Sequence, residues 1–175
     1  MKQLGPTDLK RLHREWSRRS RARVALLLDG VANPFNVGAI VRTAAALRVE
    51  HLYLGAGALS PAGHRVGRTS MGTERYLSWS SFERSPDAAD AAREDGYTVV
   101  GLELADAAVP LHQLSVAGDV CLAVGHEDHG LSAATLAACD AVAFVPQLGR
   151  VGSLSVAVAT AVALYELRRR EWTGG

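Results

Sequence analysis

The fold is decided by the stretch VALLLDGVANPFNVGAIVRTAAALRV, residues 24–49. Its first part, VALLL, is a continuous apolar run, which is typical of a strand that is covered on both faces. The turn NPFN follows at 33–36, and VGAIVRTAAALRV at 37–49 has its apolar residues at helical spacing. The stretch therefore predicts a buried strand that is followed at once by a helix.

The rest of the chain repeats this alternation. Further strands are expected at HLYLG (51–55), RYLSW (75–79), YTVVGLEL (97–104), DVCLAVG (119–125) and AVAFVP (141–146). Helices are expected at 86–95, 131–139 and 153–170, and a long polar connection at 55–75. Strands that alternate with helices favour an α/β fold with a mostly parallel sheet and helices on both faces.

The last expected helix, 153–170, is apolar nearly all round between Val156 and Leu164. Such a helix has to be covered on more than one side. The sheet can cover one side, and we expect a second copy of the chain to cover the other. A homodimer is therefore favoured, and an unusually deep core position is the alternative.

Charge is distributed unevenly along the chain. Residues 1–23 carry eight Lys or Arg against two acidic residues, whereas the other 152 residues carry 11 basic and 16 acidic groups. A basic arm, helical over 8–20, on a mildly acidic domain at 24–172 suggests a polyanionic partner. A solvated helix face is the alternative interpretation of the arm.

Composition limits the class of protein. A length of 175 residues suits one domain. Cys121 and Cys139 lie in apolar surroundings, which is typical of reduced cysteines in a cytosolic protein rather than of a disulfide framework. No apolar run approaches the ~18 residues that a membrane span needs. We expect a soluble, cytoplasmic protein without a membrane segment. Because only 6% of the residues are aromatic, base stacking is not expected to be its main contact with a nucleic acid.

Three polar, Gly-containing segments follow expected strands, at 29–42, 125–132 and 146–155. Ligands of open parallel sheets bind beyond the carboxyl ends of the strands. The presence of three such segments at one edge is a stronger indication of a site than any one of them.

In the first segment, Asn36 is placed to cap the helix that Val37 begins, and Gly38 would let another backbone approach closely. Arg42 falls among apolar residues, where an unpaired charge would be costly. We therefore expect its guanidinium to serve a purpose such as binding a phosphate. The alternative is a capping Asn with a surface Arg.

The second segment contains HEDH at 126–129, which invites comparison with a metal site. Zinc proteases place two histidines at i and i+4 of a helix, whereas His126 and His129 lie three apart in a loop. No metal is expected. Gly125 and Gly130 instead predict tight backbone geometry, with Glu127 as a hydrogen-bond acceptor or clamp.

In the third segment, Ser153 and Ser155 lie at the start of the closing helix. Either can cap it, and its free N–H groups could also bind a carboxylate or phosphate. The sequence has no GxSxG elbow, P-loop or GxGxxG fingerprint, so serine hydrolase, nucleotide hydrolase and nicotinamide chemistry are poorly supported.

Together the three segments resemble the motifs of SPOUT-class RNA 2′-O-ribose methyltransferases, in the SpoU or TrmH-like branch. The first motif, N-x-G-x-x-x-R, is met by Asn36, Gly38 and Arg42. The second, G-x-E-x-x-G-[LV]-S, is met by Gly125, Glu127, Gly130, Leu131 and Ser132. The third is met by Val145, Pro146, Gly149, Ser153, Leu154, Val156, Val158 and Ala159. The resemblance runs from about residue 24 to 170, and it departs at Ser155, where the family usually has Asn.

The resemblance implies a carboxyl-terminal trefoil knot at about 119–165, which holds S-adenosylmethionine. It also implies a homodimer that packs through the first and last helices of the domain, with Arg42 near the interface. The residues implied to bind the cofactor are Leu104, Gly125, His126, Glu127, Val145, Gln147, Ser153 and Leu154.

The resemblance further implies how the site works. Arg42 would bind a phosphate and assist deprotonation of the ribose hydroxyl, Asn36 would orient Arg42 and the ribose, and Glu127 and Ser155 would complete the polar surround. The implied substrate is a structured tRNA or rRNA. The side chains expected to bind it are Arg14, Arg18, Arg19 and Arg21 of the arm and Arg65, Arg68 and Arg75 of the 55–75 connection.

Two alternatives remain open. The first is a catalytically impaired RNA-binding member of the class, which the change to Ser155 favours. The second is a knotted methyltransferase that acts on a base, against which the presence of Asn36 and Arg42 argues.

Overall fold

The computed structural model describes residues 2–173. Its strands are β1 (Val24–Leu28), β2 (His51–Leu54), β3 (Ser78–Ser81), β4 (Thr98–Leu102), β5 (Val109–Pro110), β6 (Val120–Val124) and β7 (Ala141–Phe144). Its α-helices are α1 (Pro6–Ser17), α2 (Pro34–Ala46), α3 (His64–Ser70), α4 (Ser85–Glu94), α5 (Ala133–Ala137) and α6 (Val156–Thr173), and two short 3₁₀ helices are η1 (Thr73–Tyr76) and η2 (Leu111–Gln113).

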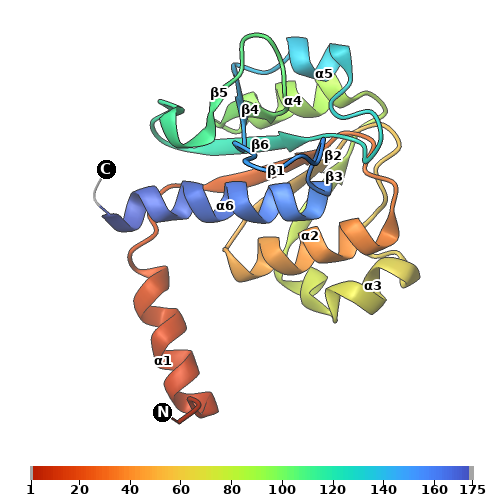
Figure 1. Ribbon diagram of the computed structural model, residues 1–175. Helices are drawn as coiled ribbons and strands as arrows, with labels where there is room; N and C mark the ends of the chain where they lie inside the picture. The colour runs from red at the N-terminus through yellow and green to blue at the C-terminus, as the bar shows by residue number, and fades with distance from the viewer. Residues whose placement is uncertain (1, 174–175) are drawn as a thin grey trace.

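The strands form one seven-stranded sheet in the order β3-β2-β1-β6-β4-β7-β5. Every neighbouring pair is parallel. Helices α2, α3 and α6 cover one face of the sheet, and α4 and α5 cover the other (Figure 1). The expected α/β fold with helices on both faces is confirmed. Because all strands are parallel, their carboxyl ends meet at one edge of the sheet.

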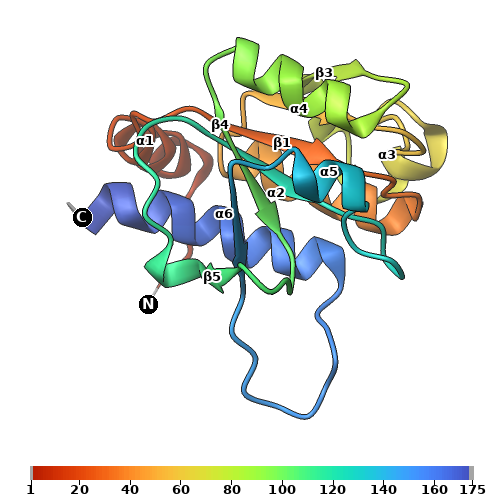
Figure 2. The ribbon, with the colours of Figure 1, turned by 90° about the horizontal axis from the view of Figure 1, so that it is seen from above.

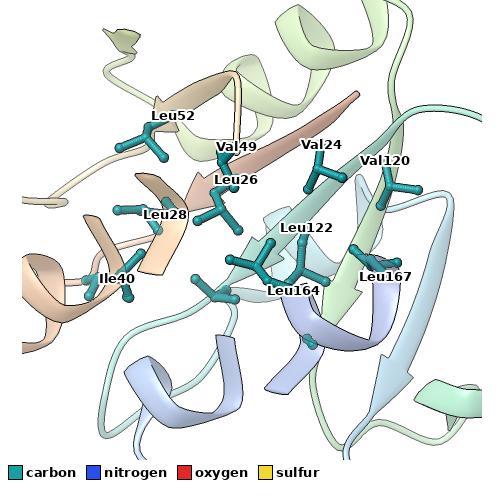
Figure 3. Packing of buried hydrophobic residues seen from close by; sticks show 14 of the residues in the cluster. Val24, Leu26, Leu28, Ile40, Val49, Leu52, Val120, Leu122, Leu164 and Leu167 are labelled. Carbon is teal, nitrogen blue, oxygen red and sulfur yellow. The ribbon is translucent and has the colours of Figure 1, made fainter. Parts of the chain in front are cut away.

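Strand β1 lies at the centre of the core, and all five of its residues are buried. Leu26 and Leu28 point to the same face and pack with Ile40 of α2 and Leu164 of α6 (Figure 3). Leu27 points to the opposite face, among buried alanines of α4. The apolar run at 24–28 therefore exists because successive side chains alternate between two covered faces.

The polar connection expected at 55–75 does join β2 to β3, but it contains helix α3 and the start of η1, which were not predicted. Helix α3 packs closely against α2 at Gly38. A Cβ on Gly38 would lie 2.5 Å from the Thr69 Cβ, so only glycine permits this approach, as the sequence suggested. Packing against α2 stabilises a short helix that its own sequence pattern does not reveal. Strand β5 and η2 were likewise not predicted.

The expected capping role of Asn36 is also wrong. Helix α2 begins at Pro34, and Asn33 caps it by accepting a hydrogen bond from the Phe35 N–H (2.9 Å). Proline suits the first helical turn because its missing N–H would have no partner there. Asn36 therefore lies inside the first turn, where its side chain is available for other contacts.

Helix α6 begins at Val156, three residues later than expected, and it is apolar on two sides. Leu164 and Leu167 are buried against the core. On the other side Val158, Val162 and Tyr165 keep 49%, 42% and 54% of their surface exposed. The single chain therefore covers only one side of this helix.

Helix α1 projects away from the sheet (Figure 1), and none of its residues is buried. Its last turn meets the end of α6, where the rings of Trp16 and Trp172 pack edge to face at 5.1 Å. The Arg48 guanidinium also donates to the Ser17 carbonyl (3.1 Å). Across residues 2–173, we find no helix whose length and apolarity would let it cross a membrane.

Asp29, at the carboxyl end of β1, joins the sheet to both helices of the α4–α5 face. Its carboxylate accepts hydrogen bonds from the Ser85 hydroxyl (2.5 Å) and the Ser132 N–H (2.8 Å). Burial raises the pKa of Asp29, but hydrogen bonds from Ser85, Ser132 and Thr135 outweigh that effect and hold the pKa below its ordinary value. The buried side chain is therefore ionised at neutral pH.

Replacing this carboxylate should destabilise the fold in a pH-dependent way. Asp29→Asn puts an amide NH₂ where donors already point, and we expect a loss of about 1–3 kcal/mol of unfolding free energy at neutral pH. Because the folded pKa is depressed, the carboxylate's contribution is complete above the ordinary pKa and is lost as the pH falls through the folded value. Urea unfolding of both proteins should therefore give curves that converge in acid.

The exposed Asp106 supplies the matched control for this measurement. Asp106→Asn should leave the unfolding free energy within about 0.5 kcal/mol of the parent. A difference between Asp29→Asn and the parent that stays constant down to acid pH would contradict the assigned role.

Candidate active site at the carboxyl edge of the sheet

Three loops meet at the carboxyl edge of the sheet, and Glu127 joins two of them. It lies in the loop after β6, and its Oε1 accepts hydrogen bonds from the Asn33 N–H (3.0 Å) and the Asn36 side-chain amide (3.1 Å). Its Oε2 accepts a longer one from the Ala32 N–H (3.4 Å). The start of α2 is thereby fixed to the β6 loop.

These donors also set the charge of Glu127. Partial burial raises its pKa, but the hydrogen bonds from Asn36 and from the backbone N–H groups outweigh burial and lower the pKa below its ordinary value. The side chain is therefore a carboxylate at neutral pH, and an ionised acceptor forms stronger hydrogen bonds than a neutral one.

The loop 125–130 folds back on itself. The His126 N–H donates to the Gly130 carbonyl (3.0 Å), and the Gly130 N–H donates to the His126 carbonyl (2.9 Å). Gly130 has a φ of +68°, and a Cβ on Gly125 would lie 2.0 Å from the Gly130 carbonyl carbon. Both positions therefore require glycine, as the sequence pattern predicted.

The two histidines of this loop contact each other rather than a common third group. The His126 and His129 rings stack with their centroids 5.0 Å apart. The His126 Nδ1 also accepts a hydrogen bond from the Asp128 N–H (3.1 Å). These contacts shape the loop, which forms one wall of a cavity.

The cavity, of about 350 Å³, lies between the loop 125–130 and the connection 145–155. Figure 2 shows this connection, between β7 and α6, as a long excursion beyond the sheet edge. The cavity is lined by all eight residues that the family resemblance implied for the cofactor: Leu104, Gly125, His126, Glu127, Val145, Gln147, Ser153 and Leu154.

The lining of the cavity is acidic, and it includes a buried acceptor that no described residue satisfies. Glu103, Glu127 and Asp128 line the cavity, and no Lys or Arg of the described residues does. The buried Oε1 of Gln147 has no hydrogen-bond partner within residues 2–173. The cavity is therefore suited to a cationic ligand that can also donate a hydrogen bond to Gln147.

Arg42 does not lie in this cavity, and the expectation that it packs among apolar side chains is wrong. Val37, Ile40, Val41 and Ala44 form the buried face of α2. Arg42 is on the outward face of the helix, where its side chain is exposed and lines a separate cavity beside α1. Neighbours in sequence point in different directions on a helix, so apolar neighbours did not imply burial.

Ser155 also lies outside the lining of the cavity. It is exposed, and its hydroxyl accepts a hydrogen bond from the Val158 N–H (3.4 Å) at the first turn of α6. Of the two serines considered for the cap, Ser155 therefore has the capping position, and Ser153 lines the cavity.

The arginines considered for RNA binding come from two parts of the chain, and all of them are exposed. Exposed arginines of α1 and the segment after it are Arg14, Arg18, Arg19 and Arg21, and those of α3 and η1 are Arg65, Arg68 and Arg75. Arg19 pairs with Glu15 (2.8 Å), and Arg75 lies over the Tyr76 ring at 4.8 Å. Residues of α1 and of η1 line one cavity, so these two elements are neighbours on the surface.

Sequence reasoning missed three residues that support the site. Asn33 caps α2 and contacts Glu127, and the Asn-Pro pair at 33–34 was an available signal for a helix start. Asp29 holds the Ser132 N–H, and Glu103 accepts from the Leu131 N–H (2.8 Å). Asp29 and Glu103 each follow a buried strand directly, and this position in the sequence could have indicated that they support the site.

Comparisons with known proteins agree with this geometry. The family model described as "SpoU rRNA Methylase family" matches residues 23–165. The 23S rRNA (guanosine(2553)-2′-O)-methyltransferase RlmP of Bacillus subtilis is 33% identical over 147 residues, which are 84% of this chain and 58% of that protein. The 23S rRNA (guanosine-2′-O-)-methyltransferase RlmB of Acinetobacter baylyi is 31% identical, over 83% of this chain and 59% of that protein.

A solved structure is similar as well. The SpoU methyltransferase AviRb of Streptomyces viridochromogenes, in complex with the cofactor AdoMet, superimposes with a TM-score of 0.78. It is 27% identical and covers 89% of this chain and 63% of its own. The chain thus spans less than two thirds of these relatives. The match over residues 23–165 shows that the chain belongs to the SpoU rRNA methylase family.

Proposed function

We propose that this chain transfers a methyl group from S-adenosylmethionine to the 2′-hydroxyl of a ribose in structured RNA, either tRNA or rRNA. The observation that carries the proposal is the junction at Glu127, which joins the asparagine-bearing start of α2 to the loop that lines the acidic cavity. RlmB and RlmP, by their names, methylate the 2′-oxygen of guanosine in 23S rRNA.

The cavity fits S-adenosylmethionine by charge and by hydrogen bonding. This molecule carries a net positive charge, and the lining supplies three carboxylates without a cationic side chain among the described residues. The unpartnered Gln147 Oε1 can accept from an amino or hydroxyl group of the ligand. Gly125, Gly130 and Gly152 leave backbone groups accessible along the walls. When bound, S-adenosylmethionine supplies an electrophilic methyl group.

The remaining task of the chain is to hold a ribose hydroxyl toward this cavity and to assist loss of its proton. We assign Arg42 to the phosphate next to the target ribose, since a guanidinium binds phosphate through its forked donors. A guanidinium stays protonated at neutral pH, so the proton passes to a phosphate oxygen or water. Asn36, held by Glu127, orients the ribose, and Ser155 contributes through the first turn of α6.

Arg42 and the cavity must come from two copies of the chain for this arrangement to work. Within one chain Arg42 lines a different cavity, on the side of α2 that faces α1. Helix α6 packs against α2, and its exposed apolar side, with Val158 and Tyr165, suits a homodimer interface. We propose that Arg42 of one copy serves the cavity of the other.

The resemblance to SPOUT-class methyltransferases also implies the path of the chain, the domain organisation and the compartment. We propose that residues 119–165 thread a trefoil knot, in which the connection 145–155 holds the cofactor. The basic arm, residues 1–23, would act as an RNA-binding extension of one domain at 24–172. We propose that the enzyme acts in the cytoplasm, where tRNA and rRNA are processed.

The activity itself is tested by methyl transfer. The full chain is incubated with S-adenosylmethionine labelled in its methyl group and with bulk tRNA or rRNA, and the RNA is then digested to nucleosides. We expect label in a 2′-O-methylated nucleoside. Label in a methylated base would support the base methyltransferase instead. Cofactor binding without any product would support the catalytically impaired alternative.

The shared site is tested by mixing two inactive variants. Arg42→Ala should abolish turnover and leave cofactor affinity within a few-fold, measured by calorimetry. Gly152→Trp should obstruct the cavity, because Gly152 lines it and a Cβ there meets no atom within 4 Å that would prevent a bulky side chain. Dimers refolded from equal amounts of both should recover about a quarter of parent activity, because half of them hold one intact site.

Each variant refolded alone is the control for this mixture and should stay inactive. If sedimentation shows dimers but the mixture recovers no methyl-transfer activity, Arg42 serves the cavity of its own chain. Monomers in the parent protein would contradict the homodimer.

The arm is tested by its salt dependence. Replacing Arg14, Arg18, Arg19 and Arg21 by Gln should weaken tRNA binding and flatten the slope of log affinity against log salt, by roughly 0.7–0.9 for each phosphate that the arm no longer neutralises. Anisotropy titrations at several salt concentrations measure both quantities. A variant with the parent's slope would rule the arm out as an RNA-binding surface.

A further inference from the structure

A second cavity, of about 630 Å³, is separate from the acidic cavity and is lined by residues of α1, α2, η1 and α6. We call it the α1–η1 groove. Ala45 and Ala46 of α2, Trp16 of α1 and Tyr76 of η1 are among the residues that line it. Volumes of roughly 300–1,000 Å³ accommodate ligands of drug or nucleotide size. The groove is therefore large enough for an unpaired nucleotide.

The charge of the groove is positive. Arg42 and Arg48 line it, and no Asp or Glu within residues 2–173 does. Arg42 makes no hydrogen bond or ion pair with any described residue, and Arg48 donates through Nη1 to α1, which leaves its Nη2 unpaired among the described residues. Arg168 also lines the groove, but backbone carbonyls and Glu171 occupy its guanidinium. Two guanidinium groups are therefore available for phosphate.

Of the aromatic residues Trp16, Tyr76 and Trp172 that line the groove, the first two are exposed and each has a guanidinium beside it. Tyr76 keeps 66% of its surface exposed and Trp16 keeps 39%. Arg75 lies over the Tyr76 ring at 4.8 Å, and Arg19 over the Trp16 ring at 4.6 Å. Proteins bind unpaired bases of RNA by stacking them on aromatic rings and guanidinium planes while cations hold the phosphates.

We propose that the α1–η1 groove binds a single-stranded segment of the RNA substrate. An unpaired base stacks against Tyr76 or Trp16, and Arg42 and Arg48 hold the phosphates. Because Arg42 is also the residue assigned to the phosphate of the target nucleotide, the bound segment is contiguous with that nucleotide. This inference rests on the proposed RNA methyltransferase function, and it places the substrate strand along the outward face of α2.

The experiment measures binding of a labelled, unstructured oligoadenylate to the full chain by fluorescence anisotropy, without cofactor. Tyr76→Leu should weaken binding about 5- to 30-fold, which is the effect of losing one stacked base. Tyr76→Phe keeps the ring and should bind within about two-fold of the parent. Because Tyr76 is mostly exposed, neither change threatens folding.

The charge control is Arg11→Ala, which removes a cation from α1 outside the groove; the Arg11 side chain is 82% exposed. Its effect should be clearly smaller than that of Tyr76→Leu. An RNA duplex of equal length, in which no base is free to stack, should bind equally well to the parent and to Tyr76→Leu.

Three outcomes would overturn the groove proposal. The first is parent-like oligoadenylate binding by Tyr76→Leu. The second is equal weakening of duplex and single-stranded binding. The third is a shift from dimer to monomer in sedimentation of Tyr76→Leu, which would assign the groove to a second copy of the chain. If the activity assay detects no methylated RNA but oligoadenylate binding still depends on Tyr76, the groove stands and the methyltransferase proposal fails.

Discussion

The site depends on one ionised side chain, the Glu127 carboxylate, which is held by donors of a neighbouring loop. Backbone N–H groups at the start of α2 and the Asn36 amide all point at it. These donors would otherwise be left partly unpaired at a helix start, where N–H groups have no partner within the helix. The same interaction thus satisfies α2 and fixes its first turn beside the loop 125–130.

The parallel sheet determines why these loops meet at all. Strands β1 and β6 are direct neighbours in register, from Val24 opposite Val120 to Leu28 opposite Val124. The segments that follow them therefore leave the sheet side by side, although they are far apart in sequence. Asp29 reinforces the junction by holding the Ser132 N–H beyond the glycine-bounded loop. Sequence-distant motifs become one site through strand register.

Much of the fold and part of the site could be predicted because the relevant signals are local. The apolar run 24–28 indicated a strand that is covered on both faces, and the glycines at 125 and 130 indicated a tight loop. Three polar loops at one edge indicated where a site would lie, and the resemblance to SPOUT-class methyltransferases supplied the residues that line the cavity. Arg42 was placed wrongly because apolar sequence neighbours say little about the face of a helix that a residue occupies. Asn36 was given a capping role that Asn33 performs, beside Pro34.

Helix α3 and the α1–η1 groove could not be predicted, because both arise from contacts between segments distant in sequence. A short helix of polar residues forms where Gly38 lets it approach α2. The low aromatic content argued against base stacking as a general mode of binding, yet tertiary structure brings Trp16 and Tyr76 to the same groove. A low aromatic content therefore does not exclude a local site at which two aromatic residues lie close together.

The closed loop 125–130 has a consequence for how this protein can vary. At Gly125 the space for even one methyl group is taken by the main chain of Gly130, so the two backbones would have to separate before alanine fitted. No neighbouring side chain could shrink to make room. No substitution of Gly125 is therefore small: even alanine would push the backbone of Gly130 away and disrupt the loop that forms the cavity wall.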